Sequence, residues 1–276
     1  MTQHIIVIGG ESAEDMTRMT RIDEHIVASS GKTHPNILYI STANGDDRVK
    51  IRDFTAKYES AGCTVSNLTV FIPPFPDAGH VSSLFEQADI IYVAGGNTRA
   101  MLAVWREFGV TALLKNAWEN GKILSGVSAG AICWFDYGHS DSGGRFALVD
   151  GMGLLPGALC PHFSSEAGRE ASFVELVQHE HIQPAYALDD GVALHFKNGK
   201  CHQVIHNSAA GHAYEMTTQA PYPIPLSHRK DKCQRHQHKE ISDSALGGAL
   251  GRWRPNLRWS PFTAKSEIEE FAKWAR

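Results

Sequence analysis

The chain has 276 residues, of which 42% are hydrophobic and 20% are charged, and its formal net charge is −4. This is typical of one large globular domain, with or without an appendage, and the charge gives no reason to expect nucleic acid or an anionic membrane as main partner. The N-terminus lacks the basic and apolar regions of a signal peptide, and no apolar run approaches the ~20 residues of a membrane span.

In the first half of the chain, short β-branched runs alternate with helical patterns. We predict strands at 4–9, 36–40, 64–71, 89–94 and 122–126, and helices at 49–61 and 100–107. This alternation favours an α/β fold, in which helices cover both faces of a mostly parallel sheet. Ligands of such sheets bind at the carboxyl ends of the strands, where the glycine-rich segments 95–97 and 126–130 lie. We therefore expect a functional site at this edge.

The second half of the chain has a different pattern. Short runs at 186–196, 200–206 and 212–217, separated by turn-forming residues, predict an antiparallel β extension. From residue 226 onward there are 11 Lys and Arg against 6 Asp and Glu. We interpret 218–276 as an irregular basic extension with a terminal helix at 266–275, solvated rather than a binding arm. Residues 1–217 would form the α/β domain that carries the site.

A Gly-x-Ser-x-Gly pattern, Gly126 to Gly130, follows the strand predicted at 122–126 and has Ser128 at its centre. This pattern is typical of a nucleophile elbow, where small neighbours permit a strained turn between strand and helix. The N–H groups of the following helix would face the place where an oxyanion forms. The alternatives are a small-residue turn for close packing and a phosphate-binding turn. We interpret Ser128 as the candidate nucleophile.

A nucleophilic serine needs a base, and the base needs a group that orients it. Among the 15 histidines, His162 follows a proline between apolar neighbours, which indicates a fixed loop at a pocket edge. Asp189 and Asp190 lie at a turn, and either carboxylate would hold the imidazole tautomer, although adjacent carboxylates are also common as simple turn residues. We expect the other histidines of polar segments at the surface: His139, His179, His181, His206, His236 and His238.

Four segments, in chain order, resemble the peptidase E-like serine peptidases (family S51), a group that includes aspartyl dipeptidase and cyanophycinase. The segments are 92–98 (YVAGGNT), 126–131 (GVSAGA), 151–157 (GMGLLPG) and 160–163 (CPHF). The resemblance extends over roughly residues 4 to 217. It implies a flavodoxin-like fold akin to class I glutamine amidotransferases, with serine in place of cysteine at the elbow.

The resemblance also implies roles for particular residues. Ser128 would be the nucleophile and His162 the general base, with Asp190 at the position of the acid, often Glu in this family, and Asp189 beside it. The backbone N–H groups of Gly96 and Ala129 would form the oxyanion hole, because glycine lets the backbone approach a reacting carbonyl closely.

Two residues are candidates for substrate binding. Asn97 belongs to the segment 92–98, and Arg169 would bind a substrate carboxylate bidentately. The alternative for Arg169 is a helix-start arginine paired with Glu166 or Glu170. The segment after His162 looks shorter than in aspartyl dipeptidases, so a preference for N-terminal aspartate does not follow.

These observations together predict a serine peptidase that cleaves small peptides, a dipeptidase among the options, through an acyl-enzyme on Ser128. The alternatives are an amidase or esterase acting on a non-peptide substrate, and a non-catalytic binding protein that retains the elbow. The expected partner is a small peptide, with no nucleic acid, membrane or cofactor, and a homodimer is the assembly considered.

The cysteines and the histidines of the basic extension bear on metal binding and compartment. Five cysteines, an odd number without a C-x-x-C pair, are typical of reduced core thiols in a cytoplasmic protein. Cys233, His236 and His238 have a loosely metal-like spacing but no second ligand pair, so we predict no metal site.

Overall fold

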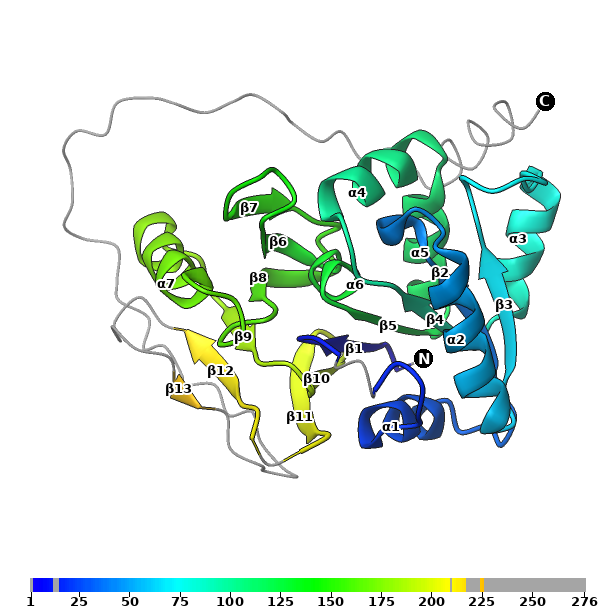
Figure 1. Ribbon diagram of the computed structural model, residues 1–276, viewed down its shortest axis with the longest axis horizontal. Helices are drawn as coiled ribbons and strands as arrows, with labels where there is room; N and C mark the ends of the chain where they lie inside the picture. The colour runs from blue at the N-terminus through cyan, green and yellow to red at the C-terminus, as the bar shows by residue number, and fades with distance from the viewer. Residues whose placement is uncertain (1, 12–14, 209, 217–223, 226–276) are drawn as a thin grey trace.

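The computed structural model describes residues 2–11, 15–208, 210–216 and 224–225 (Figure 1). The elements of its first half are β1 (His4–Ile8), α1 (Arg21–Ser29), β2 (Asn36–Ile40), a 3₁₀ turn (Thr42–Asn44), α2 (Arg48–Ser60), β3 (Thr64–Leu68), α3 (Ala78–Gln87), β4 (Ile90–Val93), α4 (Thr98–Glu107), α5 (Val110–Glu119) and β5 (Ile123–Val127). Those of the second half are α6 (Ala129–Ile132), β6 (Phe135–Ser140), β7 (Ala147–Asp150), β8 (Leu155–Cys160), α7 (Arg169–Glu180), β9 (Ala185–Leu188), β10 (Val192–Lys197), β11 (Lys200–His206), β12 (Ala213–Met216) and β13 (Ile224–Pro225). None of the helices in these ranges is both long and apolar enough to span a bilayer.

The first sheet has seven strands in the order β11-β10-β1-β5-β4-β2-β3. The five strands from β1 to β3 in that order are parallel, whereas β10 and β11 extend the β1 edge antiparallel. When β2 is counted as the first strand of the parallel sheet, β3, β2, β4 and β5 lie in the order 2-1-3-4, which is the beginning of the flavodoxin-like order 2-1-3-4-5. Strand β1 occupies the fifth place. The predicted α/β fold with a mostly parallel sheet is confirmed.

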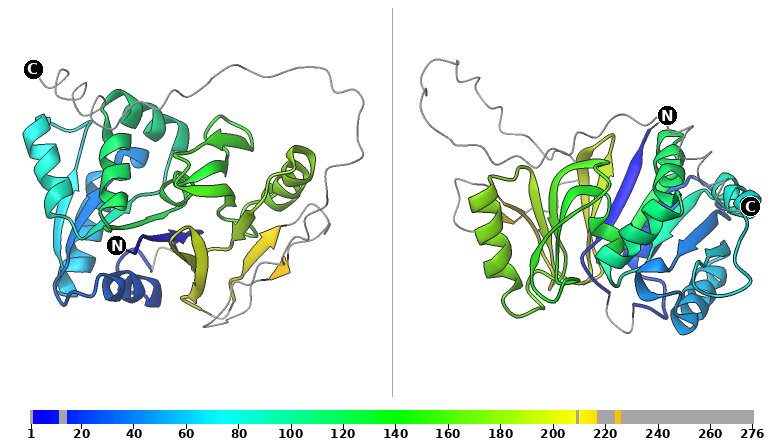
Figure 2. Two further views of the ribbon diagram at one scale, coloured as in Figure 1. Left: turned by 180° about the vertical axis from the view of Figure 1, so that it is seen from behind. Right: turned by 90° about the horizontal axis from the view of Figure 1, so that it is seen from above.

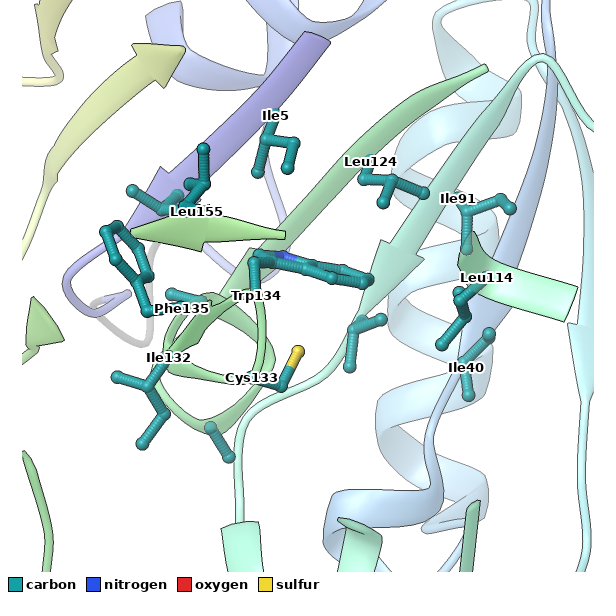
Figure 3. Packing of buried hydrophobic residues seen from close by; sticks show 14 of the residues in the cluster. Ile5, Ile40, Ile91, Leu114, Leu124, Ile132, Cys133, Trp134, Phe135 and Leu155 are labelled. Carbon is teal, nitrogen blue, oxygen red and sulfur yellow. The ribbon is translucent and has the colours of Figure 1, made fainter. Parts of the chain in front are cut away.

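The central parallel strands are mostly apolar because both faces of the sheet are covered, whereas β3, at the edge, is only partly buried. In β1, Ile5 and Val7 pack toward α3, α4 and α5, whereas Ile6 and Ile8 pack toward α1 and α2. The same alternation runs through β2, β4 and β5. Figure 3 shows side chains of β1, β4 and β5 on the side that faces Trp134.

The second sheet has six strands in the order β13-β12-β9-β8-β6-β7, and α7 covers one face of it. Figures 1 and 2 show α7 at the opposite end of the molecule from α2 and α3. The sequence predicted one strand at 186–196, but the chain is broken at 189–191, with β9 in the second sheet and β10 in the first. This break holds Asp189 and Asp190 between the two sheets.

Some predictions need correction or lie outside the described residues. His139 is completely buried rather than at the surface. The described cysteines, at 63, 133, 160 and 201, are all buried, as expected for core residues. Apart from β13, the extension 218–276 lies outside the described residues, and so do the predicted terminal helix, Cys233, His236 and His238. Helices α1, α3 and α5 and strands β6, β7, β8 and β13 were absent from the sequence prediction, and α7 entered it only through the helix-start alternative for Arg169.

Candidate active site

Four neighbouring parallel strands end at one edge of the first sheet (Figure 1). Chain segments that follow β1, β2, β4 and β5 meet there, as expected for an open parallel sheet. The segment after β5 contains Ser128, and the segment after β4 contains Gly95 and Gly96. The predicted location of the site thus contains the residues that the sequence singled out.

Ser128 lies between β5 and α6 in a strained conformation, with φ +53° and ψ −113°. A non-glycine residue at positive φ costs about 1–3 kcal/mol and is held by its surroundings. A Cβ added at Gly126 would lie 2.3 Å from the Gly130 carbonyl oxygen, and one added at Gly130 would lie 2.2 Å from the Val93 carbonyl oxygen. Both glycines of the motif are therefore required for α6 to pack against the strands.

His162 follows β8 and is also at positive φ, +52°. Its Nε2 is 2.9 Å from Ser128 Oγ, and its Nδ1 is 2.7 Å from Asp190 Oδ1. Because an ionised carboxylate only accepts hydrogen bonds, Nδ1 carries the proton and Nε2 accepts from the serine hydroxyl. The three side chains form one hydrogen-bonded chain.

The two adjacent aspartates have different surroundings. The Asp190 side chain is 40% exposed, and the hydrogen bond with His162 is the main cause that lowers the pKa of its carboxyl below the ordinary value. Asp189 is buried and accepts hydrogen bonds from the backbone N–H groups of Ser164 and His212. The sequence did not decide between the two as the residue that orients His162. The structure places Asp190 against the imidazole, whereas Asp189 accepts hydrogen bonds from the backbone of two separate loops.

Gly10 is a site residue that sequence reasoning missed. A Cβ at this position would lie 1.9 Å from Asp190 Oδ1 and 2.6 Å from His162 Nδ1. Its carbonyl oxygen accepts a hydrogen bond from the N–H of Gly191, next to Asp190. The available signal was the Gly9-Gly10 pair directly after the first strand, at the same sheet edge as the elbow.

The Gly95-Gly96 segment passes close to Ser128. A Cβ added at Gly95 would lie 3.2 Å from Ser128 Cβ, and Gly96 has φ +145° with no room for a Cβ beside the Ala43 carbonyl oxygen. Ala129 is the first residue of α6. Gly95 and Ala129 thus lie next to the serine, and the N–H groups of Gly96 and Ala129 remain the predicted oxyanion-hole donors.

The structure gives the two predicted substrate-binding residues other partners. The side-chain oxygen of Asn97 accepts from Ala100 N–H at 2.9 Å, which makes Asn97 the N-cap of α4. Arg169 is only 2% exposed and binds Glu166 through Nε at 2.7 Å. Its Nη1 donates to the carbonyl oxygen of His139. Arg169 therefore has the contacts of the structural alternative, a helix-start arginine paired with Glu166.

A cavity of about 230 Å³ opens beside Ser128 and His162. Its walls include the aromatic rings of Tyr39, Phe54 and Tyr92, and Tyr39 stacks on Phe54 with ring centroids 3.9 Å apart. Its polar lining includes Glu11, Asn44, Lys50 and Lys57. Sequence reasoning identified none of these polar residues, because they come from separate segments with no shared motif.

Comparisons with known proteins identify the family of this chain. The sequence profile of peptidase family S51 matches residues 5–204. A Bacillus subtilis (strain 168) protein named uncharacterized peptidase YgaJ is 34% identical over 230 residues, which are 82% of this chain and 99% of that protein. Peptidase E of Pasteurella multocida (strain Pm70) is 26% identical over 195 residues, covering 64% of this chain and 76% of that protein.

A solved structure is similar in fold. The crystal structure of a peptidase from an acI-B1 Actinobacterium has a TM-score of 0.61 against this chain at 16% sequence identity. The match covers 83% of this chain and 95% of the other. At this level of identity, the likeness concerns the fold alone.

Proposed function

The chain belongs to peptidase family S51 and is a serine peptidase, and from that premise we propose that it cleaves small peptides, dipeptides among them, through an acyl-enzyme on Ser128. The observation that carries the proposal is the hydrogen-bonded chain from Ser128 through His162 to Asp190, at 2.9 and 2.7 Å. A nucleophile, a base and an orienting carboxylate in this order are the requirements of acyl transfer by serine.

In the proposed reaction, Ser128 Oγ attacks the scissile carbonyl carbon while His162 Nε2 takes the hydroxyl proton. The imidazolium that forms is stabilised by the Asp190 carboxylate through Nδ1–H. The N–H groups of Gly96 and Ala129 stabilise the oxyanion of the tetrahedral intermediate. His162 then gives its proton to the leaving amine, the C–N bond breaks, and water hydrolyses the ester on Ser128 by the same steps in reverse.

The size of the cavity supports a small substrate. Pockets for drug-sized ligands typically measure about 300–1,000 Å³, and the cavity beside Ser128 measures about 230 Å³. It suits one residue of a peptide better than an extended segment. A dipeptide or the first residue of a short peptide therefore fits the proposal best.

A fluorophosphonate probe tests the proposal, because Ser128 Oγ would displace fluoride from phosphorus and keep the phosphonyl group. We expect one label per chain by intact mass, no label in Ser128→Ala, and a much slower reaction in His162→Ala. The matched control is Ser83→Ala in α3, whose hydroxyl oxygen accepts a hydrogen bond from Gln87; it should be labelled like the parent chain. Absence of labelling in a chain that circular dichroism shows to be folded would contradict the proposal. A panel of dipeptides, other amides and esters then identifies the substrate class.

A further inference from the structure

The cavity beside Ser128 combines an aromatic wall with two ionisable side chains of opposite sign, the buried Lys57 and the partly buried Glu11. Lys57 of α2 and Asp23 of α1 form an ion pair at 3.0 Å, and both side chains are 2% exposed. Glu11 follows β1, and its Oε1 accepts a hydrogen bond from Tyr92 Oη at 2.7 Å. Glu11 and Lys57 both line the cavity. A substrate would bind the one of these two side chains that still has hydrogen-bonding capacity.

Lys57 is already saturated. Its ammonium group has three N–H donors, and these reach Asp23 Oδ1 at 3.2 Å, Asp23 Oδ2 at 3.0 Å and the Asp15 carbonyl oxygen at 3.0 Å. The charge of Lys57 is balanced by the Asp23 carboxylate, which also accepts from Tyr58 Oη. Lys57 is therefore poorly suited to hold a substrate carboxylate.

Among the residues that the structure describes, Glu11 has hydrogen-bonding capacity left. A carboxylate has about four lone-pair sites, and the Tyr92 hydroxyl occupies one of them. Burial raises the pKa of Glu11, and the nearby Lys57 ammonium and the Tyr92 hydrogen bond oppose that rise. Holding this carboxylate ionised costs folding free energy, since desolvation disfavours the charge. Such a cost is common where a charge serves a ligand rather than the fold.

We propose that Glu11 binds the ammonium group of the residue on the acyl side of the scissile bond, which makes it a specificity-determining residue. The inference rests on the proposed acyl transfer at Ser128. An ammonium group has two sources, the free N-terminus of the substrate or a lysine side chain. An acidic side chain would be repelled by Glu11, although Lys50, which also lines the cavity, would attract it.

Protection of Ser128 from the fluorophosphonate tests the inference without knowledge of the natural substrate. Four ligands would be compared: norleucinamide, N-acetylnorleucinamide, N-acetyllysinamide and N-acetylglutamic acid amide. Norleucinamide against its acetylated form isolates the N-terminal ammonium, and the acetylated lysine against the acetylated norleucine isolates the side-chain ammonium. The measured quantity is the ligand concentration that halves the labelling rate.

For the parent chain, we expect one of the two ammonium ligands to protect at a concentration at least about 10-fold lower than its neutral counterpart. In Glu11→Gln this difference should vanish, while the neutral ligands protect as before. The matched control is Glu119→Gln, an exposed glutamate at the end of α5, in which the preference should persist. Because the substitution removes a desolvated charge, the melting temperature of Glu11→Gln should stay equal or rise.

Each other outcome has a distinct meaning. Absence of labelling in the parent chain would overturn the proposed function, and this inference with it. Normal labelling without a preference for either ammonium ligand, or with a preference that survives in Glu11→Gln, would overturn this inference alone. Best protection by the acidic ligand would do the same. A lower melting temperature with all ligands weakened equally in Glu11→Gln would indicate a structural role for Glu11 instead.

Discussion

Replacing Asp190 with asparagine tests the third member of the proposed catalytic chain. The substitution keeps the shape of the side chain but removes the charge that faces His162 Nδ1 at 2.7 Å. An amide can also turn its N–H₂ toward Nδ1, which favours the tautomer with the proton on Nε2. That tautomer is unable to accept the Ser128 proton.

The expected magnitude follows from exposure. A hydrogen bond to a charged group contributes about 1.5–3 kcal/mol, and solvent screening reduces this where the carboxylate is 40% exposed. About 1.5–2 kcal/mol corresponds to a loss of roughly 10- to 30-fold in rate. The tautomer with the proton on Nε2 adds to this loss, so we expect a reduction of at least about 10-fold, up to the roughly 10⁴-fold drop that the wrong tautomer causes when a triad aspartate is replaced by asparagine.

The assay is the second-order rate constant for fluorophosphonate labelling of Ser128, supplemented by kcat/KM on any dipeptide that is cleaved. Asp189→Asn is the matched comparison, because Asp189 is buried and accepts hydrogen bonds from Ser164 and His212. It should lower the melting temperature, with a smaller effect on labelling of the folded chain. A larger loss of labelling in Asp189→Asn than in Asp190→Asn, with both chains folded, would refute this assignment of the acid.

Three further predictions concern packing and pH. Gly10→Ala places a methyl group on the Asp190 carboxylate, so labelling of Ser128 should fall at least about 10-fold in a chain that circular dichroism shows to be folded. Arg169→Gln breaks the pair with Glu166, so urea unfolding should show a loss of about 2–3 kcal/mol while the order of preferred substrates stays the same. His195 hydrogen-bonds two other histidines, and burial lowers its pKa from 6.5 to about 2. As the pH is lowered, the unfolded chain therefore binds this proton first. Below about pH 6.5, the free energy of unfolding should decrease by up to ~1.4 kcal/mol for each unit by which the pH is lowered. In urea unfolding measured at several pH values, His195→Gln should show a smaller dependence on pH.

The sequence alone determined the parts of the fold and site that depend on local patterns. The apolar runs at 37–40 and 90–93 identify parallel strands because a sheet buried on both faces needs uninterrupted apolar residues. The spacing in Gly126-Val127-Ser128-Ala129-Gly130 is local as well, since two close backbone approaches require the two glycines. His162 was found through its motif and its fixed loop.

Only the tertiary structure decided which side chains meet across the chain. Asp190 rather than Asp189 reaches His162, because the chain leaves the second sheet after β9 and enters the first at β10. Arg169 is buried against Glu166, where its sequence position allowed a substrate role equally well. Glu11 meets Tyr92 from 81 positions away, because β1 and β4 lie on either side of β5. Contacts of this kind depend on strand order, and strand order is set by the packing of the whole sheet rather than by any local pattern.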